Sequence, residues 1–274
     1  MIEIPEGITL AKQLDKELKN KKIVDLVADS SHHSFAWYNG DPKEYTKNFT
    51  GKVVEGAYSY GGKLHLQLSD NCGFMFCDGT TPRYYTDKSK LPKKHQLYIE
   101  FEDSTYLICT IRMYGGIMGY TGILDNDFDY VARVKLDLFS EEFNLDYFKG
   151  ILASSGKGKL SAKAFLATGQ RIPGLGNGVA QDILFNAEIS PKRDMATLSE
   201  EEFEKLFHAT KDTIIDMTEK GGRDVENDIY GNPGGYQTIL SKNTYLNPCP
   251  RCGREIKKEA YLGGSVYYCM NCQK

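Results

Sequence analysis

The carboxy-terminal stretch 249-CPRCGREIKKEAYLGGSVYYCMNC-272 decides how this end of the 274-residue chain folds. Cys249 and Cys252 form one C-x2-C pair, Cys269 and Cys272 form a second, and sixteen residues separate them, a spacing typical of four-thiolate zinc sites. The alternating residues between the pairs suit a hairpin, which would bring both pairs to one ion. We therefore expect one structural Zn²⁺, since four thiolates leave no position for water. Disulfides or free thiols are the alternative.

Composition excludes several classes of protein. The hydrophobic share of 41%, the charged share of 26% and a mean hydropathy of −0.45 describe a globular chain rather than a disordered one. Seven cysteines are too sparse for a disulfide scaffold. No apolar run approaches the roughly 18 residues that cross a bilayer, and the amino terminus lacks the order of a secretory signal. We expect a cytoplasmic protein without a membrane partner.

The charge of the chain is unevenly distributed. A net charge of −3 with a pI near 6.0 gives no global attraction to a polyanion, so any nucleic-acid site must be local. Residues 97–147 hold ten acids and three bases, a net −7, whereas residues 151–193 and 241–274 each hold six bases and two acids, a net +4. The basic stretches thus gather in the carboxy-terminal part, although a solvated surface explains the charge alone equally well.

Upstream of the cysteines, the apolar residues recur at helical spacing. The segments with this pattern are 143–151, 162–166, 179–184 and 199–217. The third is entered through the loop 172-IPGLGNG-178, and the fourth begins with a capping box of Ser199 and Glu202 and stops at Gly221. Residues 221–247 are polar and rich in Gly and Asn, which predicts a long ordered loop.

The amino-terminal half predicts one helix followed by a β-rich domain. Residues 7–20 have the pattern of an amphipathic helix. From about 22 to 137 the segments are short, β-branched and aromatic, and Gly, Asn or Asp separates them. These segments are KIVDLVAD (22–29), SFAWYN (34–39), GKVVEGAYSY (51–60), KLHLQL (63–68), GFMFCD (73–78), QLYIEF (96–101), TYLICTI (105–111) and ARVKLDL (132–138). They predict an antiparallel sandwich or barrel, and hence an α+β protein.

Four motifs occur in one order: E-x-P-E at the amino terminus, a β-rich half, G-x-G-N at 174–177 within a helical half, and the terminal cysteines followed by Gln273. In this order the chain resembles the formamidopyrimidine-DNA glycosylase and endonuclease VIII family along its whole length. The resemblance implies a β-sandwich, a helix-two-turn-helix domain and a zinc finger that hold damaged duplex DNA, flip an oxidised base and excise it. It divides the chain into a catalytic-like domain (1–138), a helix-two-turn-helix domain (139–222), a linker (223–246) and the finger (247–274).

The resemblance also implies which residues contact DNA. Asn177 takes the place of an asparagine on the DNA backbone, Lys163 adds positive charge, and Tyr236 corresponds to a tyrosine that touches phosphate. The amides of the loop 172–178 would also meet phosphate at the positive end of a helix. Arg112 and Tyr114 resemble the residues that fill the gap left by the flipped base. Helix-entry geometry, loop packing and hairpin chemistry are the respective alternatives.

Catalytic residues follow from the same resemblance. Glu3 and Glu6 stand at the family's carboxylate positions, where one protonates the sugar and the other positions the amino terminus. Lys63 corresponds to a lysine near the lesion phosphate and is a substitute nucleophile. Alternatively, the glutamates only compensate a helix dipole and Lys63 is an ordinary strand lysine.

The chain departs from the family at its nucleophile. The family attacks the sugar with the α-amine of an amino-terminal proline, whereas position 2 here is Ile2, so we expect Met1 to be retained and the amine to move by about 3.5 Å. The finger arginine is replaced by Gly264. The family's wedge methionine has only Thr80 as its nearest match, and Met113 replaces an arginine. The departures gather on the lesion side.

Two functions therefore remain open. The first is a base-excision repair glycosylase and abasic-site lyase with altered chemistry, which uses the amine of Met1 or Ile2, or Lys63. The second is a catalytically silent protein that binds distorted DNA or structured RNA. We expect a monomer that is associated with the nucleoid when bound to DNA. The preferred lesion has no signature in the sequence.

Overall fold

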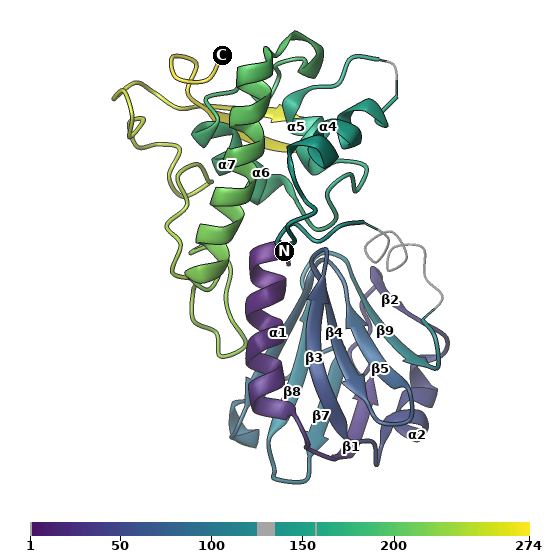
Figure 1. Ribbon diagram of the computed structural model, residues 1–274. Coiled ribbons are helices and arrows are strands. Elements are labelled where there is room, and N and C mark those ends of the chain that lie inside the picture. The colour runs from purple at the N-terminus through teal and green to yellow at the C-terminus, as the bar shows by residue number, and fades with distance from the viewer. Residues whose placement is uncertain (1, 125–134, 157) are drawn as a thin grey trace.

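The computed structural model describes residues 2–124, 135–156 and 158–274, and shows a β-rich half and a helical half (Figure 1). The helices are α1 (Ile4–Leu18), α2 (Tyr45–Phe49), α4 (Leu145–Ala153), α5 (Ala162–Ala167), α6 (Asn177–Asn186) and α7 (Glu200–Glu219). The strands are β1 (Ile23–Ala28), β2 (Ala36–Tyr38), β3 (Val54–Tyr60), β4 (Lys63–Leu68), β5 (Cys72–Phe76), β6 (Thr80–Tyr85), β7 (Leu97–Phe101), β8 (Tyr106–Ile111), β9 (Gly115–Thr121), β10 (Lys257–Tyr261) and β11 (Gly264–Tyr268). Three short 3-10 turns are Pro42–Glu44, Lys88–Lys90 and Met195–Thr197. No helix within these described ranges is both long and apolar enough to span a bilayer.

Two sheets form the amino-terminal half, so the predicted sandwich is confirmed. One sheet has the order β1-β7-β8-β6, and the other has the order β2-β9-β5-β4-β3. All neighbours are antiparallel except β2 and β9, which run parallel. Alternate side chains of each sheet face the other, as the pleat requires. The core between them includes Phe49, Phe74, Phe76 and Phe101, each at most 1% exposed.

Two strands, β6 and β9, lie outside the predicted segments. Pro82 interrupts the pattern of β6, and a proline usually argues against a central strand. However, β6 is the edge of its sheet, where a missing N–H is tolerated. In β9 the glycines make the sequence resemble a turn. Gly119 is nevertheless a strand residue, and it is a glycine because a Cβ there would lie 2.8 Å from the rings of Phe49 and Tyr45. Of the predicted strand 132–138, residues 132–134 lie outside the described residues, and 135–138 form no strand.

Helix α1 joins the two halves. Its Leu10, Leu14 and Leu18 are buried in the core of the sandwich, and its Ile4 belongs to the core of the helical half. Figure 1 shows α1 beside β3 and next to the lower end of α7. The first described residues, Ile2 to Ile4, therefore lie where the two halves meet.

The predicted helices of the carboxy-terminal half are present. Ser199 Oγ accepts the N–H of Glu202 at 3.1 Å and Glu202 Oε2 accepts the N–H of Ser199 at 2.8 Å, which confirms the capping box of α7. Phe148, Phe165 and Phe203 form the aromatic centre of this half. The finger hairpin, β10 and β11, is also present and packs on α6, where Tyr267 N–H donates to Gln181 Oε1 at 2.7 Å.

A buried carboxylate on α6 binds the middle of the linker between α7 and the finger. Asp182, on α6, accepts the N–H groups of Ile239 at 2.9 Å and Leu240 at 2.8 Å. Burial raises the pKa of Asp182 to about 6, although both amides and the Tyr236 hydroxyl lower it. Helix α6 therefore helps to order the predicted long loop.

We expect Asp182→Ala to lower the free energy of unfolding by about 2–4 kcal/mol, because two buried N–H groups lose their acceptor. Asp182→Asn, which keeps one acceptor oxygen, should lose less. Urea unfolding of the three proteins measures this difference. Equal stability of the alanine variant and the parent would contradict the role of Asp182.

Candidate functional site

Glu3 is buried at the start of α1, and its carboxylate binds the start of α6. Its oxygens accept the N–H groups of Gly176 at 2.9 Å, Gly178 at 3.1 Å and Val179 at 3.0 Å. A Cβ at Gly176 or Gly178 would come within 2.8 Å of this carboxyl group, so the glycines of 172-IPGLGNG-178 permit the approach. These amides, which we expected to face a phosphate, therefore donate to a carboxylate of the same chain.

Arg223 lies between Glu3 and Glu6, and all three are at most 5% exposed. Its Nη1 is 3.2 Å from Glu3 Oε1, and its Nε and Nη2 donate to the two oxygens of Glu6 at 2.9 and 2.8 Å. Burial raises the pKa of Glu3 above its ordinary value, against the opposing charge of Arg223. Burial acts in the same direction on Glu6, but Arg223 outweighs it and lowers the pKa of Glu6.

Sequence reasoning missed Arg223. It follows α7 in an ordinary glycine-rich stretch, and its partners are 217 and 220 positions away along the chain. One general rule could have indicated a residue of this kind: two buried carboxylates near the amino terminus need a buried cation beside them. That requirement names no particular arginine.

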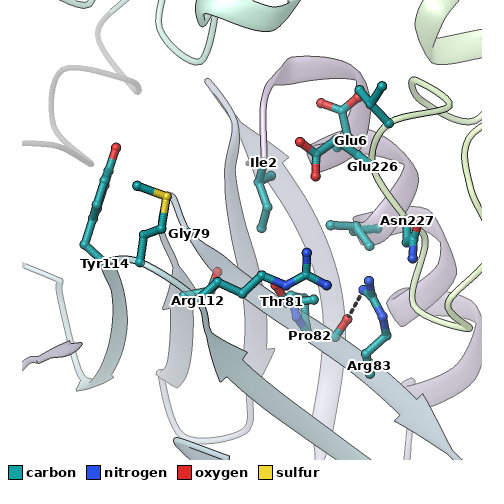
Figure 2. A pocket seen from close by; sticks show the side chains of 14 residues that line it. Ile2, Glu6, Gly79, Thr81, Pro82, Arg83, Arg112, Tyr114, Glu226 and Asn227 are labelled. Carbon is teal, nitrogen blue, oxygen red and sulfur yellow. Dashed lines mark hydrogen bonds between the residues drawn. The ribbon is translucent and has the colours of Figure 1, made fainter. Parts of the chain in front are cut away.

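A cavity of about 190 Å³ opens beside the amino terminus (Figure 2). Its lining comes from four places: the amino-terminal segment, β6, the turn between β8 and β9, and the linker after α7. The residues are Ile2, Glu6, Leu10, Gly79–Arg83, Arg112–Tyr114 and Val225–Asn227. Figure 2 places Arg112 and Arg83 on one side of the cavity and Glu6 with Glu226 on the other. Cations and carboxylates thus face one apolar space that the first residues of the chain help to close.

Of the predicted catalytic residues, Glu6 and Ile2 line this cavity, and Met1 lies outside the described residues. Lys63 starts β4, is buried, and has its Nζ 4.0 Å from Asp78 Oδ1. Lys63 is not among the residues that line the described cavity. The turn before it is nevertheless close to the amino terminus, because a Cβ at Gly62 would lie 3.4 Å from Ile2 O.

Asn177 and Lys163 both touch the hairpin of the finger. Asn177 Nδ2 donates to Ser265 O at 3.2 Å, while its buried Oδ1 has no hydrogen-bond partner among the described residues. Lys163 Nζ donates to Tyr261 O, and burial lowers the pKa of Lys163. A Cβ at Gly264 would lie 3.7 Å from both side chains. Lys163 therefore places a cation beside Gly264.

Tyr236, Arg112 and Tyr114 differ in exposure. Tyr236 is 6% exposed, hydrogen-bonds to Asp182 and lies under the Lys220 ammonium. These contacts are the loop packing given above as the alternative to a phosphate contact. Arg112 and Tyr114 are exposed and line the cavity. The structure thus brings Arg112 and Tyr114 to the same space as Ile2 and Glu6, and places Tyr236 within the linker.

The four terminal cysteines form a structural zinc site. Their sulfur atoms all lie within 4.8 Å of one another, with Cys249 to Cys272 at 3.9 Å and Cys252 to Cys269 at 3.5 Å. Tetrahedral coordination with zinc–sulfur bonds of about 2.3 Å separates the sulfurs by about 3.8 Å, so the geometry fits. The site belongs to a small cluster with Phe185 of α6 and Leu240 of the linker.

Comparison with known proteins identifies two regions. Residues 135–227 match the formamidopyrimidine-DNA glycosylase H2TH domain, and residues 247–274 match the zinc finger found in FPG and IleRS. The formamidopyrimidine-DNA glycosylases of Lactobacillus delbrueckii and Carboxydothermus hydrogenoformans are 27% and 28% identical over 284 and 281 residues, which cover all of this chain and all of theirs.

Solved structures show the same fold. Lactococcus lactis Fpg in complex with DNA containing an abasic site has a TM-score of 0.83 at 22% identity, and covers 99% of both chains. The MutM (FPG) protein of Thermus thermophilus has a TM-score of 0.80 at 24% identity, and covers 99% of this chain and 98% of its own. The arrangement of sandwich, helices and finger is therefore shared along the whole chain.

Proposed function

Because this chain belongs to the formamidopyrimidine-DNA glycosylase and endonuclease VIII family, we propose that it is a DNA repair glycosylase that holds damaged duplex DNA between its two halves. The observation that carries the proposal is the cavity beside Ile2, which the amino terminus, the sandwich and the linker all line. Its relatives named as formamidopyrimidine-DNA glycosylases support the same reaction class.

The chemistry that we propose uses an amine at the amino terminus. An α-amine has a reference pKa of about 7.7–8.0, so part of it is neutral near pH 7. Its nitrogen forms a bond to C1′ of the sugar while the bond from C1′ to the base breaks, and the base leaves with the proton that the amine gives up. The bond from C1′ to the ring oxygen O4′ then breaks as O4′ gains a proton, which turns the C1′–nitrogen bond into a Schiff base. Loss of a proton from C2′ and departure of the 3′ phosphate complete the β-elimination. The amine is that of Met1, or of Ile2 where Met1 has been removed, and Lys63 is the substitute nucleophile.

Glu3 and Glu6 serve this amine in different ways. Glu6 lines the cavity and is held ionised by Arg223, so we assign it to positioning the amino-terminal end. Glu3 has its pKa raised by burial, as a proton donor to the sugar requires, although its oxygens are already bound to α6. We propose that Glu3 shares in proton transfer from this position.

The nucleic-acid contacts extend from the cavity to the finger. We propose that Arg112 and Tyr114 enter the gap in the duplex and that Asn177 and Lys163 bind phosphate at the finger hairpin. Lys163 then supplies the charge that Gly264 cannot. Tyr236 supports this surface by ordering the linker. We propose a monomer that acts on the nucleoid in the cytoplasm, with the four regions bounded as the sequence predicts.

A silent binder is the second candidate function. Ile2 favours the silent binder. Its side chain is 5% exposed and lines the cavity at the place where a reacting amine would lie. Gly264 favours it as well, because residues 262–265 at the tip of the finger hairpin include no cation. Such a protein would bind distorted DNA or structured RNA without cutting it.

Borohydride trapping separates the two functions. With a duplex that contains an abasic site, we expect a covalent adduct, and peptide mass spectrometry should place it on the amino-terminal peptide. Lys63→Ala should retain the adduct, whereas an adduct lost in that variant identifies Lys63 as the nucleophile. Intact mass shows whether Met1 is retained. Tight binding of the duplex or of structured RNA with no adduct would establish the silent binder instead.

A further inference from the structure

A pair of exposed aromatic rings continues the cavity outward. Tyr114 lines the cavity and is 40% exposed, and Trp37, on β2, is 50% exposed. Their ring centroids are 6.1 Å apart with an interplanar angle of 55°. Met113, which also lines the cavity, is 73% exposed. The two rings therefore form one aromatic surface, the Trp37–Tyr114 pair, that begins in the cavity and extends onto β2.

Strand β2, which carries Trp37 at the edge of its sheet, is held by contacts of its neighbouring residues. Tyr38 packs against the core of the sandwich and its hydroxyl donates to Gln96 O at 3.2 Å. Trp37 is in register with Gly116 of β9, and Gly115 N–H donates to Phe35 O at 3.0 Å. The neighbour in register has no side chain to cover Trp37. A half-exposed indole is thus presented by a pinned strand, so little conformational entropy is lost when a flat partner stacks on it.

We propose that the Trp37–Tyr114 pair is a stacking surface for an unstacked nucleobase of bound DNA, an inference that rests on the proposed function. A base removed from a duplex leaves neighbouring bases with an exposed face, and aromatic side chains bind such faces whatever the base. Arg112, exposed and adjacent in sequence to Met113 and Tyr114, supplies a cation for the adjoining phosphates. Trp37 therefore adds a second aromatic ring beside Tyr114.

The chain offers a direct probe, because Trp37 is its only tryptophan. We expect the intrinsic fluorescence of the full-length protein to be quenched by a duplex with an abasic site opposite a natural base, and to be quenched less by a fully paired duplex of the same length. Trp37→Leu should bind the abasic-site duplex about tenfold more weakly, as loss of one stacked ring predicts. Trp37→Phe, which keeps a ring, should bind within about twofold of the parent.

Tyr230→Leu is the matched control, since Tyr230 is 44% exposed but does not line the cavity. Its affinity for both duplexes should equal that of the parent. Absence of quenching together with an unchanged affinity of Trp37→Leu would overturn the inference, provided that the parent still prefers the abasic-site duplex. Equal weakening of both duplexes by Trp37→Leu overturns it too, because a stacking surface acts on the unpaired base. A parent that binds both duplexes equally counts against the proposed function itself.

Discussion

Replacing Arg223 with methionine should lower the free energy of unfolding by about 3–5 kcal/mol at pH 7, the largest stability change expected from a single substitution here. Arg223 makes ion pairs with both Glu3 and Glu6, and all three side chains are buried. Methionine fills much of the same volume but leaves two buried carboxylates without a cation. The same change frees Glu6 to move within the cavity, so excision should be lost even where the variant is folded.

The loss should depend on pH in a defined direction. Without the guanidinium, burial keeps the folded-state pKa of one carboxyl group above its unfolded value, so the folded state holds a proton that the unfolded state has released. The penalty is then complete above the raised folded-state pKa and shrinks as the pH falls towards the unfolded value of about 4.3. Urea unfolding of parent and variant at pH 7 and pH 5 measures this, and the difference between them should be smaller at pH 5.

Lys149→Met is the control for charge removal. Lys149 pairs with Glu200 at 2.7 Å, but the two side chains are 42% and 80% exposed. Solvent screens an exposed pair, so it contributes little to stability and this variant should resemble the parent. If both variants lost the same stability, burial of the Glu3–Arg223–Glu6 cluster would not be the cause.

The predictable parts of the fold are those that a short segment specifies by itself. The zinc hairpin was predicted because the spacing of four thiolates determines both the turns and their meeting point. The capping box of Ser199 was predicted for a similar reason, since its two hydrogen bonds join residues three positions apart. Strand β6 was not, because only its place at the sheet edge makes Pro82 acceptable, and edge position is a tertiary property.

The candidate site was predicted in part for the same physical reason. Glu3 and Glu6 were named as a pair, yet what binds them, Arg223 and the α6 amides, comes from distant parts of the chain. The sequence predicts that the amides of the loop 172–178 meet a phosphate at the start of a helix, whereas in the structure they donate to the carboxylate of Glu3. A local pattern thus indicates that a segment binds an anion. It does not indicate whether that anion belongs to a ligand or to another segment of the chain.

This arrangement links the position of the amino terminus to the helical half. Glu3 binds α6, Glu6 binds Arg223 just after α7, and the finger hairpin touches α6 through Asn177. A displacement of α6 would therefore move both the amino-terminal segment and the finger. Loss of the finger should consequently affect DNA binding well beyond the contacts of the hairpin itself.

We expect Cys249→Ser to release zinc and to weaken binding of an abasic-site duplex by at least about a hundredfold. The finger is too small to have a core of its own, and the free energy of zinc binding is the free energy that folds it. Cys249 is 2% exposed and clusters with Phe185 of α6, so an unfolded finger also exposes part of that helix. Zinc content per chain and a binding titration measure the two effects.

Two further measurements keep this prediction decisive if the serine variant folds poorly. Chelation of zinc from the parent should reproduce the loss of binding, and added Zn²⁺ should restore it. Cys72→Ala is the matched control, because Cys72 is a buried thiol of the sandwich core outside the metal site, and this variant should keep one zinc and its affinity. A zinc-free protein that binds the duplex as tightly as the parent would show that the finger hairpin, with Asn177 and Lys163 beside it, takes no part in the nucleic-acid interface.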